Sequence, residues 1–281
     1  MNRRKRTLPR GWYPYDGKDC KREIESYLEG WSPSRLPSIK GRGGVIPHAG
    51  WYFSGKLATR VFASLTPKNK VEVVVLYGGH LSSKDAPRIM TEETYETPLG
   101  DIEIHPDFVK TLMKRVDMSK ESPNSGDNTI EVQLAMVKYF FPEAKLVGIR
   151  SPLSLKAEVL GKEVAEIAKR EGISLLAIGS TDLTHYGPNY GFLRKGTGPA
   201  SVEWVKKEND RGFIDHALKM DAEGLLNHAL ENDSACSAGA VVSAVATCKA
   251  LGSEKGVLLD YYTSYDIMPD DSFVGYAGIL Y

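Results

Sequence analysis

Apolar runs alternate with segments of helical periodicity along this chain. Three mainly apolar runs, at residues 71–79, 144–150 and 173–180, predict strands that are buried on both faces of a parallel sheet. The segments 54–65 and 154–172 instead space their aliphatic residues on one helical face, which predicts amphipathic helices. Strands that alternate with helices in this way favour an α/β fold, with a central, largely parallel or mixed sheet flanked by helices.

The rest of the chain extends this pattern. Further strands are predicted at residues 43–47, 256–266 and 272–281, an antiparallel hairpin at 91–106, and helices at 105–116, 130–141 and 237–252. Pro47 is expected to end the first strand, and Ser54 to cap the helix that begins near Gly55. Because no linker with a change of composition divides the chain, we expect one domain over residues 1–281.

The composition is that of an ordinary globular protein, with 42% hydrophobic and 26% charged residues among 281. Lys and Arg number 36, as do Asp and Glu, so net charge favours neither a nucleic acid nor an anionic membrane as partner. Only the start, MNRRKR, is strongly basic, and we expect residues 1–10 to form a flexible tail. No apolar stretch reaches the length of a membrane span, and no secretory leader is recognisable.

The three cysteines, Cys20, Cys236 and Cys248, fit neither a disulfide framework nor zinc-finger spacing. We therefore expect reduced thiols and a cytoplasmic location. Cys236 precedes the small-residue helix at 237–252, whose positive end would lower the pKa of a thiol and favour the thiolate. The alternative is a buried small hydrophobe, an interpretation that suits Cys248 inside the helix.

Polar side chains follow three of the predicted strands. His48 and His80 each come directly after a strand, and Asp182 and His185 follow a third. In open α/β sheets ligands bind beyond the carboxyl ends of the strands, so these side chains are expected at one edge. Each histidine alone is explained as a hydrogen-bonded loop residue, but their convergence favours a site. The other histidines lie at or within helices and are interpreted as structural: His105, His216 and His228.

Two imidazoles and a thiolate form a donor set that suits zinc, copper or iron better than magnesium or calcium. His48, His80 and Cys236 are therefore the candidate metal ligands. No glycine-rich nucleotide motif and no Gly-x-Ser-x-Gly elbow occurs, so nucleotide-dependent and α/β-hydrolase functions lack support.

Residues next to these motifs are candidates for substrate contact. Glu131 lies near a helix start that Asp127 or Asn128 can cap, and a capping role there is the simpler interpretation. The candidate substrate-binding residues are Trp51, Tyr52, Glu131 and Tyr186. The aromatic residues Trp12, Tyr13 and Tyr190 also lie near the motifs and are candidates for lining a cleft, although aromatic residues more often belong to a core.

Six segments resemble, in their order, the MEMO family, whose bacterial and archaeal members are called AmmeMemoRadiSam system protein B. They are PHAGWYFSG, YGGH, EVQL, GSTDLTHYG, ACSAGAVV and FVGYAGILY. The resemblance runs from RGWYP near the N-terminus to Tyr281. It implies a fold shared with class III extradiol dioxygenases, the non-haem iron enzymes that open catechol rings.

The resemblance also implies roles for individual residues. His48 and His80 match two metal-binding histidines, and Cys236 matches the position at which true dioxygenases carry a glutamate. His185 matches the histidine that serves the dioxygenases as acid and base, with Asp182 beside it. His185 and Asp182 are accordingly the candidate catalytic residues.

Two departures bear on the function. A thiolate stands in place of the carboxylate of the 2-His-1-carboxylate triad that supports iron(II) oxygen chemistry. Many family members also have a histidine before the EVQL segment, where this chain has Asp127-Asn128-Thr129. If that histidine takes part in chemistry, this chain lacks a proton donor or a metal contact; if it caps the helix, Asn128 or Thr129 can replace it.

Three functions stay open at this point. The leading one is an iron- or copper-dependent, dioxygenase-like redox protein in which His185 moves protons. The second is a non-catalytic module that binds a peptide or protein in the same cleft, because eukaryotic relatives are adaptors of phosphotyrosine-containing receptor tails. The third is a zinc-dependent hydrolase. The naming of the family further implies AMMECR1-type and radical-SAM partner proteins.

Overall fold

A nine-stranded sheet forms the centre of the protein, whose computed structural model describes residues 2–32, 41–66 and 70–281. Its strands in chain order are β2 (Gly43–Ile46), β3 (Val73–Leu81), β4 (Arg88–Ile89), β7 (Ser119–Lys120), β8 (Lys145–Pro152), β9 (Leu175–Ser180), β10 (His185–Tyr186), β11 (Val257–Thr263) and β12 (Phe273–Leu280). A smaller sheet contains β1 (Arg3–Arg4), β5 (Thr94–Tyr95) and β6 (Ile102–Glu103).

The large sheet is mixed. Its order is β10-β12-β2-β9-β3-β8-β4-β7, and β11 pairs antiparallel with β12 in addition. The central strands β2, β9, β3 and β8 run parallel, whereas β12 pairs antiparallel with β2. The predicted α/β fold with a largely parallel or mixed sheet is thus confirmed. Parallel pairing also brings the carboxyl ends of β2, β3 and β9 to one edge.

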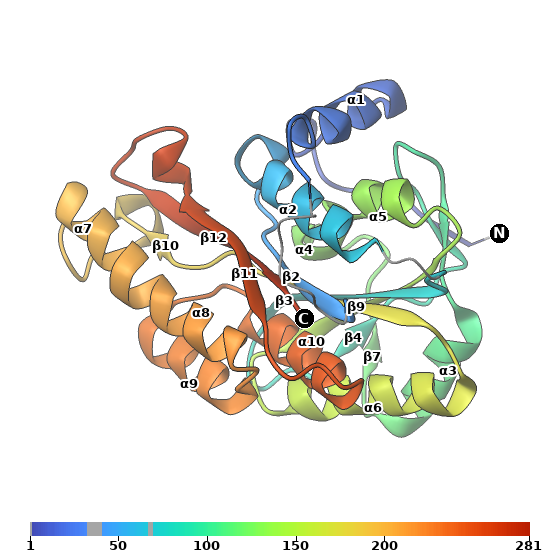
Figure 1. Ribbon diagram of the computed structural model, residues 1–281. Coiled ribbons are helices and arrows are strands. Elements are labelled where there is room, and N and C mark those ends of the chain that lie inside the picture. Colours follow the sequence, from blue (N-terminus) through green and yellow to red (C-terminus); the bar gives the residue numbers. More distant parts are fainter. Residues whose placement is uncertain (1, 33–40, 67–69) are drawn as a thin grey trace.

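Helices cover both faces of the sheet (Figure 1). They are α1 (Gly17–Tyr27), α2 (Trp51–Leu65), α3 (Pro106–Arg115), α4 (Asn128–Glu131), α5 (Leu134–Phe140), α6 (Lys156–Glu171), α7 (Pro199–Trp204), α8 (Asp210–Leu218), α9 (Ala222–Asn232) and α10 (Ala238–Ala250). Three short turns complete the set: η2 (Pro188–Tyr190), η3 (Val205–Asn209) and η4 (Ser264–Asp266). In Figure 1, α1, α2, α4 and α5 lie above the sheet, and α6 and α10 lie below it.

The small-residue helix α10 packs closely, as its sequence predicts. Every residue from Ala238 to Cys248 is buried. The helix contacts α6 and β9, and a side chain in place of Gly161 on α6 would lie 2.3 Å from the Ser243 carbonyl oxygen. The absence of a side chain at Gly161 therefore lets the two backbones approach, which a larger residue would prevent.

The entry to α2 differs from the expectation. The helix begins at Trp51 with Gly50 as its N-cap, rather than near Gly55. The hydroxyl of Ser54 donates to the carbonyl of Ala49 (2.9 Å) inside the first turn, so Ser54 is not the cap. The prediction failed because the small residues after Pro47 already turn the chain into the helix.

The N-terminal segment is ordered against the domain rather than a flexible tail, so that prediction is wrong for residues 2–10. Strand β1 pairs parallel with β5, and the Arg4 guanidinium is buried against Glu92 at 3.1 Å and the Ser122 carbonyl at 2.7 Å. Arg4 finds these two partners 88 and 118 positions away in sequence, which local composition does not reveal. Met1 lies outside the described residues.

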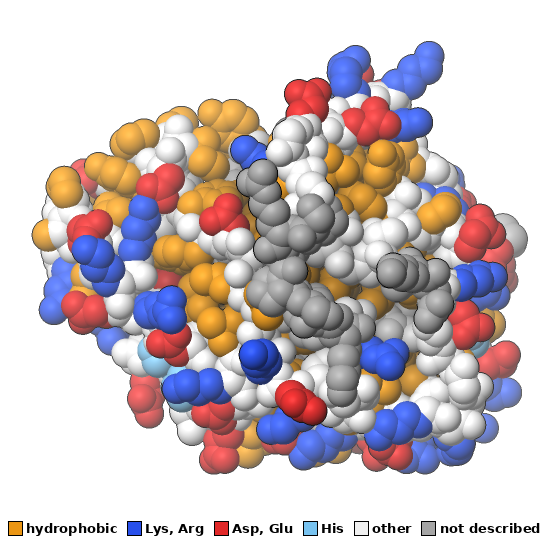
Figure 2. Space-filling model, in the orientation of Figure 1, with side chains coloured by type: hydrophobic (Ala, Val, Ile, Leu, Met, Phe, Trp, Pro, Cys, Tyr) orange, Lys and Arg blue, Asp and Glu red, His pale blue; other side chains and the backbone are white. Residues whose placement is uncertain are grey.

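Charges of both signs are interspersed on the face drawn in Figure 2, which agrees with the balanced totals of 36 basic and 36 acidic residues. Among the described residues, none of the helices is long and apolar enough to span a bilayer.

Candidate metal centre

Three side chains from distant parts of the chain meet at the carboxyl-end edge of the sheet. His48 follows β2, His80 lies near the end of β3, and Cys236 immediately precedes the N-cap of α10. Their ligand atoms all lie within 4.8 Å of one another, and Cys236 Sγ is 3.2 Å from His48 Nε2. The two imidazole rings stand edge to face, with centroids 5.3 Å apart. The structure thus brings together the three side chains that the sequence singled out as candidate ligands.

His48 is buried and its second nitrogen is already engaged. Nδ1 lies 3.2 Å from the Ser180 hydroxyl, which leaves Nε2 toward Cys236. The Asn128 side-chain amide donates to the His48 carbonyl at 3.0 Å, and the Gln133 amide donates to the Pro47 carbonyl at 2.7 Å. Side chains from the α4–α5 segment therefore fix the turn that carries His48.

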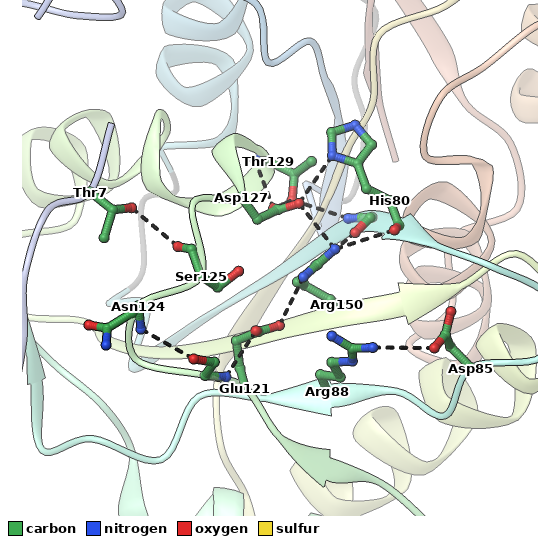
Figure 3. Close-up of polar contacts among 12 residues, drawn as sticks. Thr7, His80, Asp85, Arg88, Glu121, Asn124, Ser125, Asp127, Thr129 and Arg150 are labelled. Carbon is green, nitrogen blue, oxygen red and sulfur yellow. Dashed lines mark hydrogen bonds and ion pairs between the residues drawn. The ribbon is translucent and has the colours of Figure 1, made fainter. Parts of the chain in front are cut away.

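His80 is presented differently, from inside a strand. Its backbone has a φ of 60°, in the left-handed region that a residue with a side chain seldom adopts. Nδ1 lies 3.1 Å from Asp127 Oδ2 (Figure 3), which leaves Nε2 as the nitrogen available to a metal. Asp127 is also the N-cap of α4, one of the two candidates, with Asn128, that the sequence offered. The sequence did not indicate that Asp127 contacts a candidate ligand.

The two glycines before His80 let neighbouring segments approach the backbone of β3 closely. A side chain at Gly78 would lie 2.2 Å from Thr129 Oγ1, and one at Gly79 would lie 2.1 Å from Ser237 Oγ. Neither glycine has a positive φ, whereas His80 does. The glycine pair therefore leaves room for the loop that carries Asp127 and for the segment that carries Cys236.

The ligand cluster favours a thiolate in the protein without a bound ion. Burial raises the pKa of the Cys236 thiol, but the adjacent His48 and His80 outweigh burial, and the pKa lies well below its usual range. Burial lowers the pKa of His48, yet the charges on Cys236 and Asp182 raise it to about 9. Hydrogen bonds to Asp127 and Cys236 raise the pKa of His80 to about 10. A bound cation would replace the protons that these groups share.

A cavity of about 380 Å³ opens over two of the three ligands. It is lined by Trp12, His48, Ala49, Gly50, Phe53, His80, Asn128, Asp182, His185, Asn189, Tyr190, Ser264, Met268, Asp270, Ser272, Val274 and Tyr276. Much of this wall comes from the C-terminal segment around η4 and β12, which sequence analysis did not connect with the site. The convergence of that segment depends on antiparallel pairing of β12 with β2 and β10.

Both candidate catalytic residues reach this cavity. Asp182 accepts hydrogen bonds from the backbone N–H groups of His48 (2.7 Å) and Ala49 (3.3 Å), so it braces the turn that carries His48. His185 Nδ1 lies 3.1 Å from the Leu183 carbonyl, and its ring meets the Tyr190 ring edge to face with centroids 5.0 Å apart. Because a carbonyl oxygen can only accept, the Nδ1–H donates to it, and Nε2 takes no part in this contact.

None of the four residues expected to bind substrate lines this cavity. Trp51 is buried, and its indole N–H donates to the Val132 carbonyl at 2.9 Å. Tyr186 is fully buried in a separate aromatic cluster, and Glu131 accepts from Thr7, Leu8, Tyr13 and Tyr95 beneath the N-terminal segment. Tyr52 is 67% exposed and lies with Trp51 on a neighbouring groove. The aromatic residues that do line the cavity include Trp12 and Tyr190.

The remaining histidines and cysteines have contacts of an ordinary structural kind. His105 caps α3 through Nδ1, His216 lies 2.9 Å from Asp221, and His228 lies 2.8 Å from the Ser234 hydroxyl. Cys20 and Cys248 are buried in the core, and all three cysteines are free thiols.

Comparison with known proteins identifies the family of the chain. The sequence model of the family described as "Memo-like protein" matches residues 4–280. A "MEMO1 family protein" of Nitrosopumilus maritimus is 30% identical, and one of Methanococcoides burtonii is 28% identical; each alignment covers 99% of both chains. A crystal structure of an uncharacterized protein from Escherichia coli K12 covers 78% of this chain and 91% of that one, with 16% identity and a TM-score of 0.46, too low to carry function across. The chain therefore belongs to the Memo-like family.

Proposed function

We propose that this protein binds a redox-active transition metal, iron or copper, through His48, His80 and Cys236, and uses it in dioxygenase-like chemistry. The observation that carries the proposal is the convergence of two imidazoles and a thiol whose ligand atoms lie within 4.8 Å of one another. The residues come from three segments that are distant in sequence, so local packing alone gives no reason for their meeting.

The donor set fits such an ion. Imidazole and thiolate ligands suit zinc, copper and iron, and donors that share one ion lie ~3–4 Å apart. The separation of 3.2 Å between His48 Nε2 and Cys236 Sγ falls in that range. Each imidazole also has its other nitrogen engaged, by Ser180 or Asp127, which is the usual arrangement around metal-bound histidines.

Residues around the ion would transfer protons, hold the ligands and line the cavity. His185 lines the cavity, and because its Nδ1 faces the Leu183 carbonyl, its Nε2 would accept a proton from a substrate hydroxyl and return it. Asp182 holds the His48 turn through two backbone N–H groups, and the aromatic side chains of Trp12 and Tyr190 line the cavity. Bound iron or copper would supply electron transfer and polarisation of a substrate oxygen.

A non-catalytic peptide-binding role in the same cavity is the second candidate, and the aromatic residues Trp12 and Tyr190 in its lining support it. A zinc-dependent hydrolase is the third, because zinc accepts two imidazoles and a thiolate while keeping a position open for water. The family resemblance extends the proposal to a relation with class III extradiol dioxygenases, to AMMECR1-type and radical-SAM partners, and to a cytoplasmic location, which suits the free thiols.

Metal analysis of protein purified without an affinity tag tests the proposal. After anaerobic incubation with Fe²⁺ or Cu⁺ and removal of excess ion, we expect about one ion per chain. His48→Ala and Cys236→Ser should abolish tight binding, whereas His216→Ala and Cys248→Ala, which alter residues outside the cluster, should retain it. Equal metal content in all five proteins would refute the assignment of ligands.

The redox part of the proposal needs a separate measurement. The iron- or copper-loaded protein should consume dioxygen in the presence of a catechol or a reductant, and the zinc-loaded protein should not. His185→Gln should slow that consumption without lowering the metal content. Ester or amide hydrolysis by the zinc-loaded protein, with no oxygen consumption by the iron or copper forms, would favour the hydrolase instead.

A further inference from the structure

His80 lies in a β-bulge between β3 and β8. Gly78 pairs with Arg150 and Leu81 pairs with Pro152, so β3 has one more residue than β8 over this stretch. The extra residue and the φ of 60° at His80 turn its side chain out of the regular alternation of the strand. Without further contacts, such a bulge would leave backbone carbonyls without ladder partners and would hold His80 in a strained conformation.

The side chain of Arg150 supplies those contacts. Its Nε donates to the Gly79 carbonyl at 2.8 Å, and one terminal nitrogen donates to the His80 carbonyl at 3.3 Å. The guanidinium is held in turn by Glu121 at 3.2 Å and Asp127 at 3.3 Å (Figure 3). All three charged side chains are at most 10% exposed. A planar, fixed array of donors thus grips both carbonyls of the bulge.

Asp127 links the Arg150 guanidinium to the imidazole of His80. Its Oδ1 accepts from the Thr129 N–H, while its Oδ2 faces both His80 Nδ1 (3.1 Å) and Arg150 (3.3 Å). The two oxygens therefore have separate tasks, because one caps α4 and the other orients the ring. With Nδ1–H directed at Oδ2, the Nε2 atom of His80 is the nitrogen left to face Cys236.

We propose that Arg150 and Asp127 are positioning residues of the His/His/Cys site: Arg150 holds the bulge, Asp127 fixes the ring of His80, and together they aim Nε2 at the metal position. This inference rests on the proposed function for its metal readout. The inference concerns the orientation of the His80 ring, and not the identity of the ion or its reaction.

Asp127→Asn is the sharpest perturbation. Asparagine has the same shape and is as good a helix N-cap as aspartate. Its single oxygen can serve Thr129, but its NH₂ group then replaces Oδ2 and faces two donors, on His80 and on Arg150. The cap survives and the ring loses its acceptor, so a change in metal binding is not explained by unfolding of α4.

Zinc alone is the probe, and competition with a fluorescent chelator measures its dissociation constant. We expect Asp127→Asn and Arg150→Met to weaken zinc binding by ~10–100-fold, the range found for the outer partners of metal-bound histidines. Arg88→Met is the matched control, because Arg88 lies opposite Arg150 on β4 and its guanidinium pairs with Asp85 at 3.2 Å (Figure 3). Its dissociation constant should stay within about twofold of the unmodified protein.

A double-mutant cycle separates positioning from general destabilisation. In a His80→Ala background the ring is absent, so Asp127→Asn should change zinc affinity by less than about twofold. An equally large loss in both backgrounds would overturn the proposal, as would an unchanged affinity in Asp127→Asn alone.

A second readout needs no metal. In ¹⁵N-labelled protein, the ring Nδ1–H of His80 should exchange slowly with solvent because Asp127 accepts it, and Asp127→Asn should make that exchange fast. If the unmodified protein binds no zinc, iron or copper, the proposed function fails, while this exchange measurement still decides the positioning role. Fast exchange in the unmodified protein would refute the inference on its own.

Discussion

Asp210 offers a quantitative test of how the loop that carries Asp182 and His185 is held. It lies at the start of α8, directly after the π-helical turn η3, and its carboxyl is fully buried. It accepts from the N–H (3.0 Å) and the hydroxyl of Thr184, and from the Tyr261 hydroxyl at 2.7 Å. The perturbation is Asp210→Asn, which can keep the contacts to Thr184 and donate to the tyrosine oxygen.

The magnitude follows from the pKa of this carboxyl. Burial raises the pKa of Asp210 to about 6, although its hydrogen bonds to Thr184 and Tyr261 oppose that rise. An unfolded aspartate has a pKa of ~3.9, and one pH unit of difference corresponds to ~1.4 kcal/mol, so the full effect is of order 3 kcal/mol. Because the folded carboxyl binds its proton more tightly, its contribution to the free energy of unfolding is fully present below about pH 4 and is lost as the pH rises through 6.

Urea unfolding from about pH 4 to pH 8 is the assay. The stability of Asp210→Asn relative to the unmodified protein should rise by ~2–3 kcal/mol across this range, because asparagine carries no charge to bury. Asp215→Asn is the control, since Asp215 is on the same helix but its side chain is 41% exposed. Parallel stability curves for the unmodified protein and Asp210→Asn would refute the reasoning.

Three further predictions concern the site and its supports. Because the pKa of the Cys236 thiol is lowered, iodoacetamide should modify Cys236 first, ahead of the buried Cys20 and Cys248, and zinc should slow the reaction. Mass spectrometry of tryptic peptides measures the order of modification, and earlier labelling of Cys20 or Cys248 would contradict the prediction. Gly79→Ala should lower the melting temperature by several degrees and weaken zinc binding, because its Cβ would lie 2.1 Å from Ser237 Oγ. Adding Ser237→Gly should restore part of the melting temperature and part of the zinc affinity, and no recovery of either would show that this clash is not the cause. Glu131→Gln should speed proteolysis within residues 2–10, because both carboxylate oxygens accept hydrogen bonds and an amide NH₂ in place of one oxygen would face hydrogen-bond donors. Unchanged cleavage in a time course would show that other contacts hold the segment.

Periodicity and strand ends were enough to predict the sheet and the meeting of His48 and His80, whereas Cys236 was added from its place at a helix start and from the family resemblance. The buried strands β3, β8 and β9 follow from mainly apolar runs of sequence, and the rule that ligands bind beyond the carboxyl ends of parallel strands then applies to the residues that follow a strand. Cys236 reaches the same edge because it precedes α10, which packs against β9.

The structural features that the sequence did not predict depend on contacts between distant segments. The bulge at His80 is set by Arg150 on the next strand, and the order of the N-terminal segment is set by Glu92 and Glu131. The substrate-binding expectation for Tyr186 rested on its position beside His185, but neighbours in a strand point to opposite faces, so Tyr186 enters the core. The C-terminal wall of the cavity likewise has no local signal, because it arises from the pairing of β12.

Anomalous diffraction at the iron, copper and zinc edges, on crystals of tag-free protein loaded anaerobically, tests the central claim most directly. We predict a single peak bonded to His48 Nε2, His80 Nε2 and Cys236 Sγ, with a coordination position open to the cavity. A protein that takes up no ion at this cluster, or that binds one only elsewhere, would contradict the assignment of a metal site.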